Sequence, residues 1–121
     1  MYELSVKSDF AASHFLRHYE GKCKNLHGHT WKVEVVIQAD NLDKTGMVVD
    51  FVDVKKKLKS VLEPLDHAHL NDLAYFQDSN PTTENLAKYI FESFSKEYRQ
   101  LKVTKVIVWE SDTSSIVYYQ K

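Results

Sequence analysis

Residues 29–39, which read His-Thr-Trp-Lys-Val-Glu-Val-Val-Ile-Gln-Ala, decide the fold class. Their apolar side chains recur at every second position, which is the period of a β-strand with one buried face. That face would comprise Trp31, Val33, Val35 and Ile37. Residues 2–10 alternate in the same way, and polar side chains fill the opposite face of both segments. Strands with one polar face are typical of antiparallel sheets, so we expect these two strands to pair as neighbours.

The apolar spacing becomes helical after Asp50, a suitable N-cap residue. The first predicted helix begins at Phe51 and ends near Pro64. Its lysines at positions 55, 56, 57 and 59 form either a phosphate-binding patch or, the interpretation we favour, a solvated helix face. A second helix should begin near residues 80–84, which read Asn-Pro-Thr-Thr-Glu, and its buried stripe should extend to Tyr98.

Two further strands are predicted at residues 103–110 and 115–119, with a turn between them. The predicted class is α+β: a four-stranded antiparallel sheet with two helices on one face, in the order ββααββ. Such a sheet has two open edges, and neither outer strand carries a proline that would block pairing. We therefore expect a homo-oligomer whose sheets join edge to edge.

The composition is that of a folded, soluble chain with one domain over residues 1–121. Sixteen basic and seventeen acidic residues give a net charge of −1, so no overall field favours nucleic acid or an anionic membrane. The apolar runs are too short to cross a bilayer, and residues 1–4 do not resemble a secretion signal. The single cysteine, Cys23, cannot form an intramolecular disulfide, so we expect a cytoplasmic protein.

Three histidines are the best candidates for metal ligands. His27 and His29 flank Gly28 at the start of the second strand, so both side chains should point to one face. In an antiparallel pair, the end of the first strand lies beside this start, which brings His14 to the same place. Three imidazoles with a fourth position open are typical of catalytic zinc, although the ligand types also suit nickel or iron. The alternative is that these are ordinary polar residues at a loop mouth.

Asp66 and His67 form a second candidate group. His67 and His69 also have a spacing that suits a metal, but no predicted strand brings a third ligand to them. A carboxylate beside an imidazole is better suited to orienting the ring for proton transfer. His18 and His69 have no assigned role, and we expect both on the solvated surface.

Cys23 has two interpretations. A free cysteine is usually a small buried apolar residue. Here it lies between Lys22 and Lys24 and close in sequence to His27. Nearby positive charge favours the thiolate, so the sequence slightly favours a nucleophile or general base.

Several motifs, in this order and spacing, closely resemble the 6-pyruvoyl-tetrahydropterin synthase family, and especially its bacterial 6-carboxy-5,6,7,8-tetrahydropterin synthase branch. The resemblance covers nearly the whole chain, and the three-residue gap between Cys23 and His27 is similar to that branch. The motifs are Ala12-Ser13-His14-Phe15, Cys23-x-x-x-His27-Gly28-His29, Gly46-Met47-Val48-Val49-Asp50-Phe51, Leu65-Asp66-His67-x-x-Leu70-Asn71, Asn80-Pro81-Thr82-Thr83-Glu84 and Glu110.

The resemblance implies the tunnelling fold, with trimers that form a barrel, pairs of trimers that form hexamers, and active sites between subunits. It implies one Zn²⁺ per subunit on His14, His27 and His29. Cys23 would be the catalytic base, with Asp66 and His67 as an acid–base pair often contributed across the interface. Glu110 would anchor the pterin, and the segment that closes around the ring would contain Thr82, Thr83 and Glu84.

The implied reaction converts 7,8-dihydroneopterin triphosphate to 6-carboxy-tetrahydropterin, acetaldehyde and triphosphate, in queuosine biosynthesis. Arg17, Lys22 and Lys24 are candidates to receive the triphosphate. One alternative is the same fold and metal with a pyruvoyl product. A more remote alternative is a non-catalytic, zinc-stabilised oligomer that binds pterin.

Overall fold

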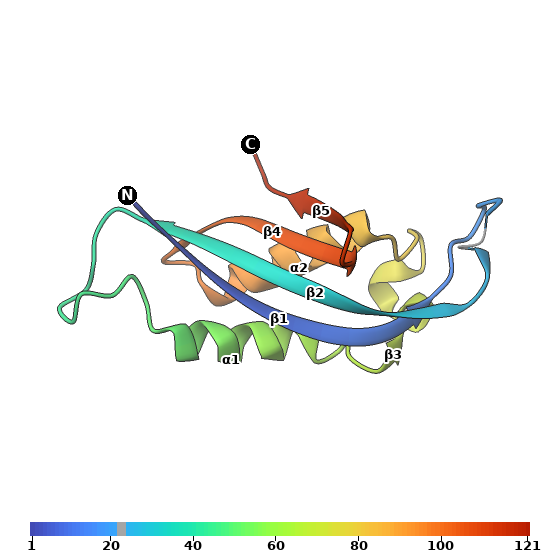
Figure 1. Cartoon of the computed structure of the whole chain (residues 1–121), viewed down its shortest axis with the longest axis horizontal. Coiled ribbons are helices and arrows are strands. Elements are labelled where there is room, and N and C mark those ends of the chain that lie inside the picture. Colours follow the sequence, from blue (N-terminus) through green and yellow to red (C-terminus); the bar gives the residue numbers. More distant parts are fainter. Residues whose placement is uncertain (22–23) are drawn as a thin grey trace.

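Two long antiparallel strands form the frame of the protein. In the computed structural model, which describes residues 1–21 and 24–121, β1 (Tyr2–His14) pairs with β2 (His27–Ala39) along its full length (Figure 1). Phe10 lies opposite Trp31 and His14 lies opposite His27. The predicted pairing is confirmed, and the strands extend beyond the predicted ranges because the alternation of faces continues to the histidines.

The sheet has five strands in the order β3-β1-β2-β4-β5. Antiparallel strands β4 (Lys102–Ser111) and β5 (Ser114–Tyr118) extend it on the β2 side. On the other side, the two-residue strand β3 (Ala68–His69) pairs in parallel with Ala12 and Ser13 of β1. The prediction of four antiparallel strands in the order ββααββ was therefore wrong at β3. A strand of two residues is too short to produce an alternating pattern.

Two helices complete the α+β class that the sequence predicts. Helix α1 (Phe51–Leu62) begins at the predicted N-cap Asp50, whose carboxylate accepts a hydrogen bond from the N–H of Val52. Helix α2 (Thr83–Glu97) has Thr82 as its N-cap. Between them lie two short 3₁₀ helices, η2 (Leu70–Asp72) and η3 (Ala74–Phe76), which the sequence analysis did not predict.

Both helices share one hydrophobic core with the sheet. Its fully covered side chains include Trp31, Val33, Val35, Leu58, Leu86, Ile90, Phe94, Val106 and Val108. Because Phe10 stacks on Trp31, this core reaches the end of the sheet where the histidines lie. Neither helix combines the length and apolar character that a membrane crossing requires, within the residues described.

Candidate metal centre

The strand register brings three imidazoles to one point. His14 lies opposite His27 and Ala12 lies opposite His29, so all three histidine side chains are on the face that carries Trp31. The ring centroids are 4.5 Å (His14–His27), 4.7 Å (His27–His29) and 5.2 Å (His14–His29) apart. One ring nitrogen from each lies within 4.8 Å of the others. The structure thus places together the three residues that the sequence nominates as metal ligands.

Two of the rings have their tautomers fixed by backbone carbonyls. His14 Nδ1 lies 2.7 Å from the carbonyl oxygen of Pro81, and His27 Nδ1 lies 2.7 Å from that of Asn25. A carbonyl oxygen only accepts, so both rings donate their N–H from Nδ1, and each ring in its neutral form carries its lone pair on Nε2. These two Nε2 atoms are 2.9 Å apart. Facing lone pairs repel each other, so this arrangement suits a shared cation.

The third ring supplies a buried nitrogen without a hydrogen-bond partner in the described structure. This atom is His29 Nε2, and the Glu110 carboxylate lies 3.8 Å from it. Burial lowers the pKa of both His14 and His29, which favours the neutral rings that can ligate a metal. Three imidazole nitrogens at one point, one of them buried without a partner, fit a divalent transition metal.

Glu110 connects this centre to a neighbouring hollow. One of its oxygens faces His29, and the other accepts a 3.0 Å hydrogen bond from the hydroxyl of Thr83. The hollow has a volume of about 220 Å³. It is lined by Thr83, Glu84, Glu110, Ser114, Ser115 and Ile116. Thr82 behaves differently, because its hydroxyl oxygen accepts from the N–H of Asn85 and so caps α2. Three of the four predicted substrate residues therefore line one hollow beside the histidines.

Asp66 and His67 lie at the opposite edge of β1. The Asp66 carboxylate accepts from the N–H of Ala11 at 3.0 Å, and its other oxygen lies 3.1 Å from His67 Nδ1. The N–H of Ala11 is the main reason that the pKa of Asp66 is lowered. His67 has a φ of 58°, and its side chain is 84% exposed. The structure joins the two residues to each other, as predicted, but directs His67 into solvent and not toward the histidine cluster.

A model of the family described as 6-pyruvoyl tetrahydropterin synthase matches residues 3–121 of this chain. The chain belongs to the 6-pyruvoyl tetrahydropterin synthase family. It is 34% identical to the 6-carboxy-5,6,7,8-tetrahydropterin synthase of Haemophilus influenzae, over 99% of this chain and 100% of that protein. It is 38% identical to the human 6-pyruvoyl tetrahydrobiopterin synthase, over 96% of this chain and 90% of that protein.

The fold of the 6-pyruvoyl tetrahydropterin synthase family is also evident from a solved structure. The Caenorhabditis elegans 6-pyruvoyl tetrahydropterin synthase superposes with a TM-score of 0.90 at 27% identity. The match covers 99% of this chain and 96% of that one. The α+β architecture described above is therefore the architecture of the family.

The structure places the remaining residues that the sequence singled out in different surroundings. Arg17, considered as a triphosphate ligand, donates instead to the carbonyls of Asn71, Phe76 and Ser79 at 2.8–3.3 Å. His69 is only partly exposed, since it is hydrogen-bonded to Ser13 and stacks on Phe15, so the surface prediction was wrong for it. His18 is exposed, as predicted. Cys23 and Lys22 lie outside the described residues, and Lys24 is exposed.

The sequence analysis missed the groups that hold the histidines. Pro81 and Asn25 act through backbone carbonyls, which every residue has, so no residue type signals them. It also missed Asn71 and Asn80, whose side chains bind the backbone of Phe15 and Arg17, just after His14. Both belong to the motifs that carry the family resemblance, but the spacing of these motifs does not indicate which backbone groups the two side chains bind.

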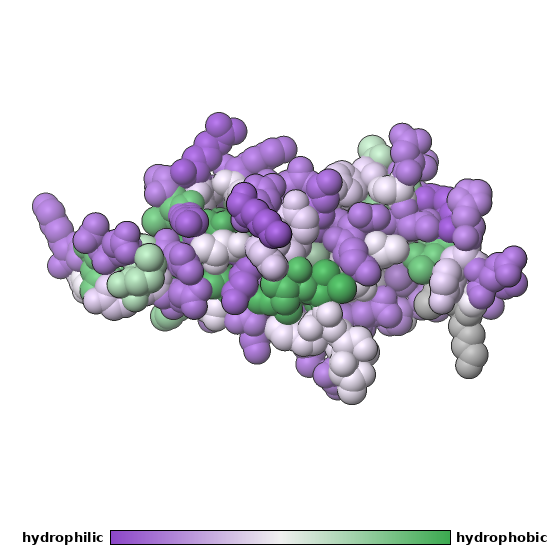
Figure 2. Space-filling view, turned by 90° about the horizontal axis from the view of Figure 1, so that it is seen from above, coloured by the Kyte–Doolittle hydropathy of each residue, from purple (hydrophilic) through white to green (hydrophobic). Residues whose placement is uncertain are grey.

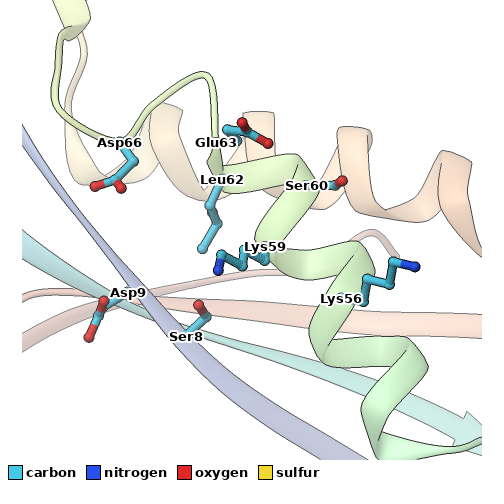
Figure 3. A pocket seen from close by; sticks show the side chains of 8 residues that line it. All are labelled: Ser8, Asp9, Lys56, Lys59, Ser60, Leu62, Glu63 and Asp66. Atoms are coloured by element: carbon cyan, nitrogen blue, oxygen red, sulfur yellow. The ribbon is translucent and has the colours of Figure 1, made fainter.

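A second hollow lies away from the histidine cluster. It has a volume of about 650 Å³ and lies between α1 and the open edge of β1 (Figure 3). Figure 3 shows that Lys56 and Lys59 extend in opposite directions from α1, while Asp66 lies on the loop that follows the helix. Glu63 and Asp9 add further carboxylates, so the lining has both signs of charge. The hollow thus borders Asp66 and not the histidine cluster.

Proposed function

We propose that this chain is a zinc-dependent lyase that converts 7,8-dihydroneopterin triphosphate to 6-carboxy-5,6,7,8-tetrahydropterin, with release of acetaldehyde and triphosphate. The observation that carries the proposal is the convergence of three imidazoles next to Glu110. A carboxylate that can bind a heterocycle thereby lies 3.8 Å from one of the candidate metal ligands. The product is that in the name of the relative called 6-carboxy-5,6,7,8-tetrahydropterin synthase, and the substrate is the one that the family resemblance implies.

His14, His27 and His29 would hold one Zn²⁺ per subunit, whose charge would stabilise negative charge on the substrate's side-chain oxygens. Glu110 would accept hydrogen bonds from the amino and N–H groups of the pterin. The Thr83 hydroxyl holds one of its oxygens and so orients the carboxylate for this task. Thr82 and Glu84 would complete the segment that closes around the ring.

Two residues would move protons. We assign the base that removes a carbon-bound proton to the Cys23 thiolate, from its place in the sequence beside the metal-ligand pair. His67 would be the second acid–base group. Its Nδ1 lies against the Asp66 carboxylate, so its Nε2 is the atom free to exchange a proton.

The active site would be shared between copies of the chain, in a barrel built from trimers that pair into hexamers. β3 covers only Ala12 and Ser13 of β1, so the remaining edge of β1 has no partner in the described chain, and β5 is the other edge. Tyr2, Val117 and Tyr119, on or next to these edge strands, are exposed. Figure 2 shows hydrophobic side chains near the middle of a largely hydrophilic face. Edge pairing would cover such strands and would give the solvent-facing His67 a neighbouring metal centre.

We also propose a biological setting for the chain, on the basis of its family. We place the chain in queuosine biosynthesis, in the cytoplasm, as a single domain over residues 1–121 with no nucleic-acid or membrane partner. The near-neutral charge of the chain supports the last point.

A pyruvoyl product is the second candidate, and the 38% identity to the human 6-pyruvoyl tetrahydrobiopterin synthase favours it. The two reactions differ in whether a carbon–carbon bond breaks. Incubation of the zinc-loaded protein with dihydroneopterin triphosphate should release acetaldehyde in step with triphosphate. Triphosphate release with a pyruvoyl pterin and no acetaldehyde would replace the first proposal with the second.

The Cys23→Ala variant distinguishes both enzymatic candidates from a third one, a non-catalytic, zinc-stabilised oligomer that binds pterin. If Cys23 is the base, this variant keeps zinc and pterin binding but loses turnover by about 10²–10⁴-fold. Metal content and product formation are measured on the same sample. Wild-type protein that binds zinc and pterin without forming either product would support the binding protein.

A further inference from the structure

Two asparagine side chains hold the chain segment that follows β1. Asn71 accepts from the N–H of Phe15 and donates to its carbonyl, both at 3.0 Å. Asn80 does the same with Arg17, accepting at 2.8 Å and donating at 2.9 Å. A side-chain amide carries one acceptor and one donor group, as a peptide unit does, so it can substitute for a strand partner. These asparagines therefore continue the hydrogen bonding of β1 beyond its last residue, His14.

Asn80 differs from Asn71 in the residue that follows it and in the hydrogen bond that its backbone carbonyl accepts. The next residue is Pro81, whose carbonyl accepts the buried 2.7 Å hydrogen bond from His14 Nδ1. The carbonyl of Asn80 itself accepts from the side chain of Asn85 in α2 at 2.9 Å. Asn80 thus connects three things: the chain just after His14, the carbonyl that fixes the His14 tautomer, and the first turn of α2.

We propose that Asn80 is a positioning residue for the metal centre, which orients His14 through the Pro81 carbonyl; this inference rests on the metal-binding part of the proposed function. Without the Asn80 amide, the segment that contains Pro81 loses its two bonds to the backbone of Arg17 and keeps the 3.3 Å bond from the Arg17 guanidinium to the Ser79 carbonyl. The His14 ring then loses a fixed acceptor for Nδ1, and its Nε2 is no longer held toward the other two nitrogens. Groups that orient metal-ligating histidines typically contribute about 10–100-fold to metal affinity.

The experiment compares Asn80→Ala with Asn71→Ala. Each variant loses the same two kinds of hydrogen bond to the same segment, but Asn71 is more deeply buried and is not adjacent to Pro81. Removal of Asn71 should therefore cost at least as much stability, while removal of Asn80 should cost more metal affinity. Both variants are purified with the full chain, and their melting temperatures are measured without metal.

Metal binding is followed in a Trp109→Phe background, which leaves Trp31 as the only tryptophan. The Trp31 ring lies 5.0 Å from His14 and 5.1 Å from His29, so its fluorescence should be quenched by bound Co²⁺. The visible absorption of Co²⁺ reports the geometry of its ligands in the same titration. Zn²⁺ affinity follows from competition against Co²⁺.

We expect Asn80→Ala to weaken Co²⁺ and Zn²⁺ binding by about 10–100-fold and to change the Co²⁺ spectrum, with Asn71→Ala within about threefold of wild type. Asn80→Asp, which keeps the acceptor for the Arg17 N–H, should lie between wild type and Asn80→Ala. Equal losses of affinity in Asn80→Ala and Asn71→Ala, or an unchanged Co²⁺ spectrum in Asn80→Ala, would overturn the positioning role and leave the proposed function intact. Wild-type protein that binds neither ion would overturn both.

Discussion

The histidine cluster and the Asp66–His67 pair lie on either side of β1 and differ in almost every physical respect. His14 is 1% exposed and His67 is 84% exposed. The cluster is built on two long strands with regular register, whereas the pair is held by a turn and a two-residue strand at the sheet edge. The cluster is complete within one chain. The pair is aimed outward, as its proposed role across a subunit interface requires.

The largest effect should follow from loss of a ligand. His27→Ala removes one of three nitrogens, and structural zinc sites gain about 10 kcal/mol or more from all their ligands together. We expect Zn²⁺ affinity to fall by about 100-fold or more and turnover to be lost with it. Metal analysis after dialysis against a weak chelator measures this. Full metal retention by His27→Ala would show that the cluster is not the metal centre.

An intermediate effect is expected from loss of His67, which lies beside the other edge of β1. His67→Ala should keep its metal, because His67 does not contact the cluster in the described structure, while turnover falls by about 10²–10⁴-fold. A parallel loss of zinc would contradict the separation of the two regions.

Mixing the two inactive variants sharpens the comparison. If each site takes its histidines from one chain and His67 from the next, refolding His27→Ala with His67→Ala in equal amounts should restore about a quarter of the sites. Recovery is measured as turnover per subunit. No recovery from a correctly assembled mixture would place both groups of one site in the same chain.

Sequence reasoning was most successful where a repeating pattern of apolar residues determines the structure. Alternation along β1 and β2 specifies both the pairing and the face of each residue, so it also places the three histidines. It was unsuccessful where one or two residues decide the structure. The strand β3 is too short to show a pattern, and the charge of Arg17 does not reveal that its guanidinium will bind carbonyls of the 71–79 segment. Cys23 stays a prediction.

The smallest effect concerns pH. The Ala11 N–H, and secondarily His67, lower the pKa of Asp66 below the value near 3.9 of an unfolded carboxyl, so the charged form stabilises the fold. This stabilisation is complete above the unfolded pKa and is lost as the pH falls through the lowered, folded-state pKa. Asp66→Asn keeps an oxygen for Ala11 but not the charge. We expect it to lower the melting temperature by about 3 °C or less at pH 6 and to match wild type in strong acid. A difference that persists unchanged at low pH would exclude the charge as its cause.

The register of β1 and β2 has a consequence for how this family can diverge. His14 and His27 are directly opposed, so the strand register sets their relative positions. A single insertion within either strand would turn a histidine to the other face. The alignment with the Haemophilus influenzae protein extends over 143 positions, although this chain has 121 residues. Length variation is therefore tolerated in the family, and the register of β1 and β2 limits where it can occur without loss of the histidine cluster.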